Sequence, residues 1–100
     1  MAVVFLTIAP LGTGTPSVSS FVAGVETVLR SSGLTHELTA MGTIIEGDLD
    51  EILAVVRRMH EHPFGKGAVR VSTLIKIDDR RDKEHTMARK LASVREKLDR

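Results

Sequence analysis

The stretch that decides the fold is THELTAMGTIIEG, residues 35–47. It contains two short runs with strand character, 35–39 and 43–47, joined by the turn residues 40–42. Two such runs with so short a connection predict an antiparallel β-hairpin. The hairpin lies near the middle of the chain, so the fold follows from the elements expected on either side of it.

A strand and a helix are expected before the hairpin. Residues 3–11 are β-rich and apolar on both faces, which is typical of a central strand covered on both sides. The glycine-rich segment 12–16 then breaks the pattern. Ser17 is the expected N-cap of a helix that runs to about Ser32 and stops at Gly33. The apolar positions of this helix form one stripe: Val18, Phe21, Val22, Val25, Val28 and Leu29.

A helix, a strand and a final helix are expected after the hairpin. Asp48 and Glu51 have the spacing of a capping box at the start of the first of these helices. Residues 60–67 (HEHPFGKG) are expected to form a loop, and residues 68–77 a strand. Two apolar stripes mark the two helices: Leu49, Ile52, Leu53, Val56 and Met59 in the first, and Met87, Leu91, Val94 and Leu98 in the second, expected over residues 83–98.

The order strand, helix, hairpin, helix, strand predicts an α+β fold of the ferredoxin-like β-α-β-β-α-β type with an additional C-terminal helix. We expect residues 1–100 to form a single domain. In this fold both helices cover one sheet face. Because the strand at 3–11 is apolar on both faces, we expect the open face to pack against a second copy of the chain, with the last helix covering part of that face or joining the contact.

Composition excludes several classes of function. The net charge is +1 and the sequence pI about 8.2, so no nucleic acid or acidic membrane surface is expected as a partner. No cysteine is present, which excludes disulfides, thiolate metal sites and thiol catalysis and fits a cytoplasmic protein. No apolar run approaches the length of a membrane span. The aromatic residues are three phenylalanines, too few for a base-stacking surface.

Three segments have residues that bear chemistry, each with a simpler structural interpretation. The loop 12–17 precedes a helix, whose first free amides could bind an anion. The simpler interpretation is a plain turn, because the spacing matches neither a P-loop nor a dinucleotide-binding motif. His60 and His62 lack further metal ligands in the pattern and are expected at the surface or in a cap. The charged segment 78–82 is a solvated connection, or supplies a carboxylate to a polar or cationic ligand.

The hairpin offers further polar candidates. Thr43 and Glu46 are three residues apart on one strand, so their side chains are expected on opposite faces. Arg70 is a candidate partner for Glu46 or for an anion. No catalytic triad order and no paired-carboxylate motif is present, so no enzymatic activity and no cofactor is expected.

Together, four stretches resemble the small thiamine-binding proteins related to YkoF. They are PLGT at 10–13, SVSSFV at 17–22, MGT at 41–43 with Glu46 after it, and KIDDRRD at 76–82. The resemblance covers essentially the whole chain. It implies the ferredoxin-like fold, assembly into homodimers or a homotetramer that is a dimer of dimers, and binding of thiamine or its hydroxymethylpyrimidine part without catalysis.

The resemblance also implies a site. Thr43 is expected to form a hydrogen bond to the ligand and Asp78 to place a carboxylate near it, with Ser17 and Ser20 as further candidates. A carboxylate suits the thiazolium cation and the amino group of thiamine, and Met41 or Phe5 would supply an apolar wall. Two alternatives stay open: a small-molecule-sensing module that acts on a protein partner, and a small enzyme on a dimeric scaffold.

Overall fold

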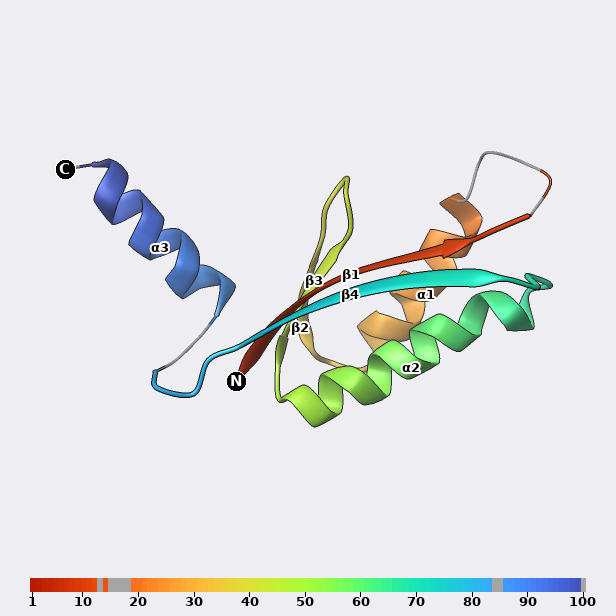
Figure 1. Cartoon of the computed structure of the whole chain (residues 1–100), viewed down its shortest axis with the longest axis horizontal. Coiled ribbons are helices and arrows are strands. Elements are labelled where there is room, and N and C mark those ends of the chain that lie inside the picture. Colours follow the sequence, from red (N-terminus) through yellow and green to blue (C-terminus); the bar gives the residue numbers. More distant parts are fainter. Residues whose placement is uncertain (13, 15–18, 84–85, 100) are drawn as a thin grey trace.

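The computed structural model describes residues 1–12, 14, 19–83 and 86–99 of the chain. Its elements follow the expected order (Figure 1): β1 (Ala2–Pro10), α1 (Ser19–Ser31), β2 (Thr35–Leu38), β3 (Thr43–Gly47), α2 (Leu49–Gly65), β4 (Val71–Asp79) and α3 (Met87–Leu98). The expected N-cap Ser17 lies outside the described residues.

The strands form one four-stranded sheet in the order β2-β3-β1-β4, and every neighbouring pair is antiparallel. Helices α1 and α2 pack beside each other against one face of this sheet (Figure 1). This arrangement confirms the predicted ferredoxin-like α+β fold. It leaves the other face of the sheet without a covering helix from the β-α-β-β-α-β unit.

The core lies between the sheet and the two helices. Alternate residues of β1 (Ala2, Val4 and Leu6) point into it, and Ile45 of β3 lies beside Val4 in the same layer. The helices contribute the remaining buried apolar side chains: Val25 and Leu29 of α1, and Ile52, Val55, Val56 and Met59 of α2. Because the strand period is two, the odd-numbered residues of β1 point to the open face.

Two of the predicted helix ends have the expected geometry. The Asp48 carboxylate accepts a hydrogen bond from the Glu51 amide at 3.2 Å, which satisfies one free donor of the first turn of α2. After α1, Gly33 has a φ of +75°, and its amide donates to the Arg30 carbonyl at 3.3 Å. Glycine suits this position because it adopts a left-handed backbone without steric cost.

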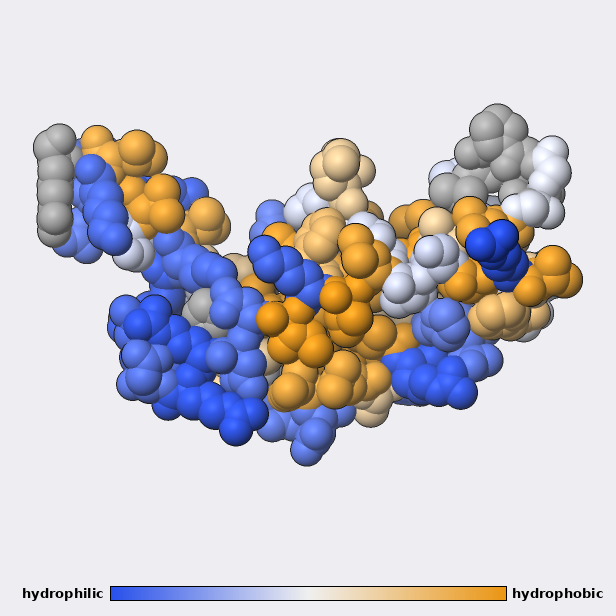
Figure 2. All heavy atoms as spheres, in the orientation of Figure 1, coloured by the Kyte–Doolittle hydropathy of each residue, from blue (hydrophilic) through white to orange (hydrophobic). Residues whose placement is uncertain are grey.

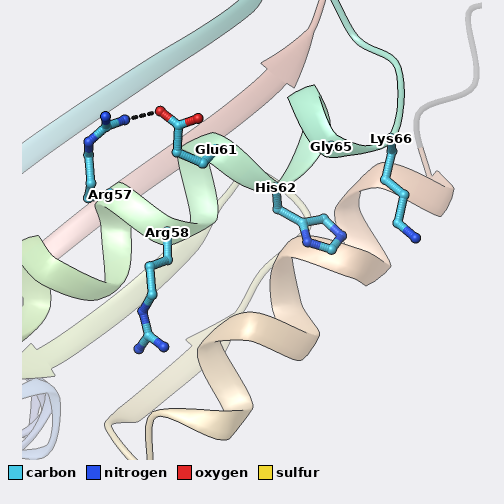
Figure 3. A pocket seen from close by; sticks show the side chains of 6 residues that line it. All are labelled: Arg57, Arg58, Glu61, His62, Gly65 and Lys66. Carbon is cyan, nitrogen blue, oxygen red and sulfur yellow. Dashed lines mark hydrogen bonds and ion pairs between the residues drawn. The ribbon is translucent and has the colours of Figure 1, made fainter.

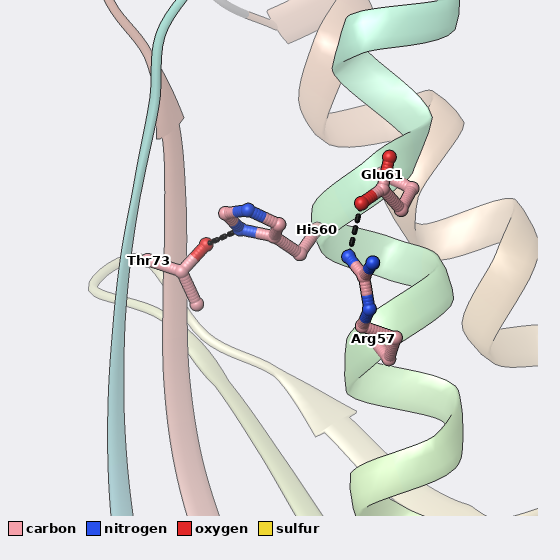
Figure 4. A network of polar contacts seen from close by, with 4 residues as sticks. All are labelled: Arg57, His60, Glu61 and Thr73. Carbon is pink, nitrogen blue, oxygen red and sulfur yellow. Dashed lines mark hydrogen bonds and ion pairs between the residues drawn. The ribbon is translucent and has the colours of Figure 1, made fainter.

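The prediction of a loop at 60–67 is wrong, because α2 continues through Pro63 to Gly65. Proline removes one helical hydrogen bond, yet burial and local capping bonds hold this last turn in place. Pro63 is buried, and its carbonyl accepts from the amides of Lys66 and Ala68 at 3.0 and 3.1 Å. His60 points toward β4, where its Nδ1 lies 2.6 Å from Thr73 Oγ1 (Figure 4).

The last strand and the last helix are both shifted relative to the predictions. Strand β4 includes Asp78 and Asp79, which were expected in a charged break. Helix α3 begins at Met87 rather than at residue 83, with the Thr86 hydroxyl accepting from the Arg89 amide at 3.1 Å. A threonine N-cap therefore sets the helix start within the polar segment.

Helix α3 stands apart from the other helices and does not cover the open sheet face (Figure 1). Polar contacts join its first turns to the sheet: the Met87 amide donates to Glu46 Oε2 at 2.7 Å, and Lys90 Nζ lies 2.8 Å from Asp78 Oδ2. The apolar side chains beyond these contacts stay exposed: Leu91, Val94 and Leu98.

Apolar side chains also occupy the open sheet face. Phe5 of β1 and Ile44 of β3 are cross-strand partners on this face, and Leu74 of β4 beside Thr7 is 63% exposed. Figure 2 shows apolar atoms both over the middle of the molecule and on α3 at the left of the view. Among the described residues no helix is long and apolar enough to cross a membrane.

Candidate functional site

The candidate site lies between α1 and the β2–β3 hairpin, where two adjoining hollows share Val22, Glu26 and Leu38. The inner hollow, of about 180 Å³, is bounded by β1, the hairpin and Met59 of α2. The outer hollow, of about 660 Å³, runs along α1 from Ser19 to Arg30. Together they have the size and the partly apolar lining of a small-molecule site.

Glu26 is the polar centre of this site. Glu26 is only 8% exposed, and its Oε1 accepts a hydrogen bond from the Thr43 hydroxyl at 2.6 Å. In the described part of the chain, no cation and no second donor reaches this carboxylate. A buried carboxylate with a single neutral partner is costly, because it has lost its water and retains unused acceptor capacity. The site therefore favours a ligand that brings hydrogen-bond donors or positive charge.

The hairpin turn shapes the rim of the inner hollow. The Thr39 hydroxyl donates to the Gly42 carbonyl at 2.7 Å and accepts from the amides of Met41 and Gly42 at 3.2 and 3.1 Å. These bonds fix the turn, and Met41 stands at its tip with 81% of its surface exposed. An unbranched thioether chain at the mouth of a hollow is adaptable enough to pack on a bound ring.

The structure brings together only some of the residues that the sequence singled out. Thr43 and Met41 both line the inner hollow. Ser20 is exposed on α1, where its neighbour Ser19 lines the outer hollow, and Ser17 lies outside the described residues. Asp78 pairs across the sheet with Val3, whereas Thr43 pairs with Leu6, so their side chains lie on opposite sheet faces. Within one chain, Thr43 and Asp78 therefore do not share a pocket.

Asp78 belongs instead to a charged cluster at the end of β4. Lys90 of α3 pairs with it. Arg81 pairs with Asp79 at 2.8 Å, and Arg80 pairs with Asp82 at 2.6 Å. The hydrogen bond from Arg80 lowers the pKa of Asp82 to about 2, so this carboxylate stays ionised at all ordinary pH values. These ion pairs fit the simpler interpretation of segment 78–82, which is a solvated connection between β4 and α3. The pair between Lys90 and Asp78 joins this connection to α3.

Other expectations concern which face or end of the sheet a side chain occupies. Thr43 points to the helices and Glu46, paired with Val3, to the open face, as predicted. Arg70 precedes the β4 residue that pairs with Pro10, at the opposite end of β1 from Glu46, so the suggested ion pair between Arg70 and Glu46 is wrong. Phe5 also points to the open face, where it lies under Gly42 of the hairpin turn.

A third hollow, of about 430 Å³, lies at the end of α2 (Figure 3). Arg57, Arg58, His62 and Lys66 line it, and Arg57 is paired with Glu61 in the same wall. The side chains of Arg57, Arg58, Glu61 and Lys66 are exposed, so this hollow has a solvated wall and lacks the buried polar centre that Glu26 gives to the candidate site. No group of three or more His, Asp or Glu side chains among the described residues forms a metal site.

Glu26 is the site residue that sequence reasoning missed. The sequence does contain a signal: Glu26 occupies the apolar stripe of α1, one turn after Val22 and next to Val25, with Leu29 one turn later. A charged residue in a core-facing stripe needs a partner. Thr43 is that partner, 17 residues away in the sequence.

Comparisons with known proteins agree with this architecture. The model of the family described as "Thiamine-binding protein" matches residues 4–95. The chain is 47% identical to the UPF0045 protein YqgV of Bacillus subtilis, with 98% of each chain covered. The crystal structure of the protein MJ1052 of Methanocaldococcus jannaschii superposes with a TM-score of 0.86 at 41% identity, covering 95% of this chain and 96% of that one. A domain of unknown function from Bacillus cereus superposes with a TM-score of 0.83 at 32% identity, covering 96% and 91%.

Proposed function

The chain belongs to the thiamine-binding protein family, and we propose that it binds thiamine in the hollow between α1 and the β2–β3 hairpin. One observation carries the proposal. The buried carboxylate of Glu26 faces this hollow, and among the described residues its one hydrogen-bonding partner is Thr43. The ligand is expected to supply the donors that the carboxylate lacks.

The aminopyrimidine ring of thiamine is the part that fits Glu26. Its exocyclic amino group donates hydrogen bonds, and a ring nitrogen beside it accepts or carries a proton. A carboxylate that accepts from a charged or strongly polarised donor forms one of the stronger hydrogen bonds in proteins. The free hydroxymethylpyrimidine presents the same edge, so it is expected to bind as well.

The apolar part of the lining suits the faces of the ligand rings. Val22 and Leu38 are shared by the two hollows, and Met41 stands at the mouth. Side chains of this kind bury ring faces, while Glu26 and Thr43 fix the orientation of the pyrimidine edge. The thiazolium cation then lies in the outer hollow, within the field of the Glu26 carboxylate.

We propose that the role is binding without chemical change, by an oligomer of this chain. The open sheet face has Phe5, Ile44 and Leu74 exposed to different degrees, and α3 leaves its own apolar stripe uncovered. A second copy with the same two surfaces would bury both. A homodimer, or a homotetramer as a dimer of dimers, accounts for them.

Isothermal titration calorimetry with thiamine, and then with hydroxymethylpyrimidine, tests this function. We expect saturable binding of thiamine and weaker binding of the pyrimidine alone. The heats give the number of sites per chain, and the mass of the protein by light scattering converts it into sites per oligomer. Recovery of unaltered thiamine after long incubation would support binding without turnover. The absence of binding heat and of any thermal shift with both compounds would refute the proposal.

A further inference from the structure

The two hollows of the candidate site contain charges of opposite sign. Among the described lining residues, Glu26 and Arg30 are the two that carry formal charge. They are four residues apart on α1, so they lie on the same helix face and are separated along the axis by about 6 Å. Glu26 is buried where the hollows meet, and Arg30 is exposed on the wall of the outer one.

Arg30 has no competing acidic partner in the described part of the chain. No described carboxylate lies within ion-pair distance of its guanidinium, although Glu26 is one helical turn away. The Thr27 hydroxyl, on the same wall, donates to the Ala23 carbonyl at 3.0 Å and keeps its own acceptor positions. The outer end of the site is thus a cationic position with five guanidinium donors available.

A ligand that matches both ends has donors or positive charge at one end and an anion at the other. Thiamine itself ends in a neutral hydroxyethyl group, which makes little use of a guanidinium. Its phosphate monoester has the same aminopyrimidine and thiazolium and adds an anion at that end. Arginine is the side chain best suited to phosphate, because its planar fork forms paired hydrogen bonds.

We infer that this site takes thiamine as its phosphate monoester, with Glu26 receiving the aminopyrimidine and Arg30 the phosphate. The inference rests on the proposed function and adds the chemical class of the ligand to it. It makes Arg30 the residue that distinguishes the phosphorylated from the free vitamin. Glu26 and Thr43 serve both forms equally.

The test is calorimetric titration of thiamine and of thiamine monophosphate at fixed ionic strength, using the wild-type chain and two variants. The wild type is expected to bind the monophosphate about tenfold more tightly, the effect of one charge-assisted contact. Arg30→Gln should abolish this preference by weakening binding of the monophosphate. Because Arg30 also lines the hollow that takes the thiazolium cation, the readout is the ratio of the two affinities in each variant, not the affinity for thiamine alone. Arg95→Gln is the matched control, since Arg95 is also a last-turn helix residue but lies on α3, away from both hollows. It should retain the preference.

The possible failures are distinct. Equal affinity of the wild type for the two compounds, or a preference that survives in Arg30→Gln, would overturn the phosphate inference and leave thiamine binding intact. Absence of binding by both compounds, in protein whose melting is unchanged, would overturn the proposed function together with the inference. Thermal melting of each variant shows that the fold is retained.

Discussion

At the scale of single residues, Glu26 and Thr43 hold the site together. Glu26 stands in an apolar stripe, where it would be destabilising without a partner, and Thr43 supplies that partner at 2.6 Å. The family resemblance had already implied that Thr43 contacts the ligand. The sequence did not indicate Glu26, because a strand-to-helix contact across 17 residues depends on the register of β3 beneath α1. The one sign of Glu26 in the sequence was its charge at a position within the apolar stripe of α1.

Replacing Thr43 with valine keeps the volume and removes the hydroxyl. The Glu26 carboxylate then loses the hydrogen bond that Thr43 donates, so we expect the free energy of unfolding to fall by about 1–3 kcal/mol. Thiamine affinity is expected to fall about tenfold, because the carboxylate is no longer oriented. Denaturant titration and calorimetry measure the two effects. Thr35→Val, at an exposed β2 position on the open face, is the control and should change neither. Wild-type values for Thr43→Val would contradict the role assigned to this pair.

At the scale of elements, local sequence signals predicted what lies within each helix and strand better than where each ends. The hairpin strand 43–47 agrees with β3, and the Asp48 cap agrees with the start of α2. The end of α2 was missed because Pro63 signals a break, whereas burial of Pro63 and the His60–Thr73 contact hold the helical turn. Such tertiary contacts cannot be read from a local pattern. The hairpin is the element on which the site depends.

Gly42 tests how closely the hairpin turn must approach β1. A β-carbon at this position would lie 2.9 Å from the Leu6 carbonyl oxygen and would also meet the Phe5 ring. Backbone cannot move aside as a flexible side chain does, so Gly42→Ala should reduce stability by about 1–3 kcal/mol. It should also weaken thiamine binding by displacing Met41 and Thr43. Gly65→Ala, where a β-carbon would meet no atom within 4 Å, is the matched control for both measurements. Equal stability of the two variants would show that the turn is not tightly packed.

At the scale of the whole molecule, the main feature is apolar surface that one chain leaves uncovered. Helices α1 and α2 cover one sheet face only, and α3 projects from the sheet with its stripe exposed (Figure 1). The predicted fold left one sheet face open, and the apolar character of both sides of β1 led us to expect that a second copy of the chain covers this face. It did not predict that α3 would stand apart, since a helical stripe does not specify which surface it will contact.

Leu74 lies on the open face and is 63% exposed in one chain. If this face packs against a second copy, Leu74→Lys places a charge in the interface, and the mass measured by light scattering should fall toward that of one chain, 10.9 kDa. Leu53→Lys makes the same change on the outer side of α2, where Leu53 is 40% exposed, and should leave the mass unchanged. A wild-type protein that is already monomeric would refute assembly through this face.

The measurement that tests the account most directly compares two acidic residues on opposite sides of the sheet, Glu26 on the covering helix α1 and Asp78 on the open face of β4. Thiamine is titrated into the wild type, Glu26→Gln and Asp78→Asn, with thermal melting to show that each is folded. Glutamine still accepts the Thr43 hydrogen bond but removes the charge, so we expect Glu26→Gln to bind about 10- to 100-fold more weakly. Asp78→Asn should bind as the wild type does, because Asp78 faces away from the hollow and is paired with Lys90. Wild-type affinity in Glu26→Gln together with lost binding in Asp78→Asn would place the ligand on the open face and contradict the account.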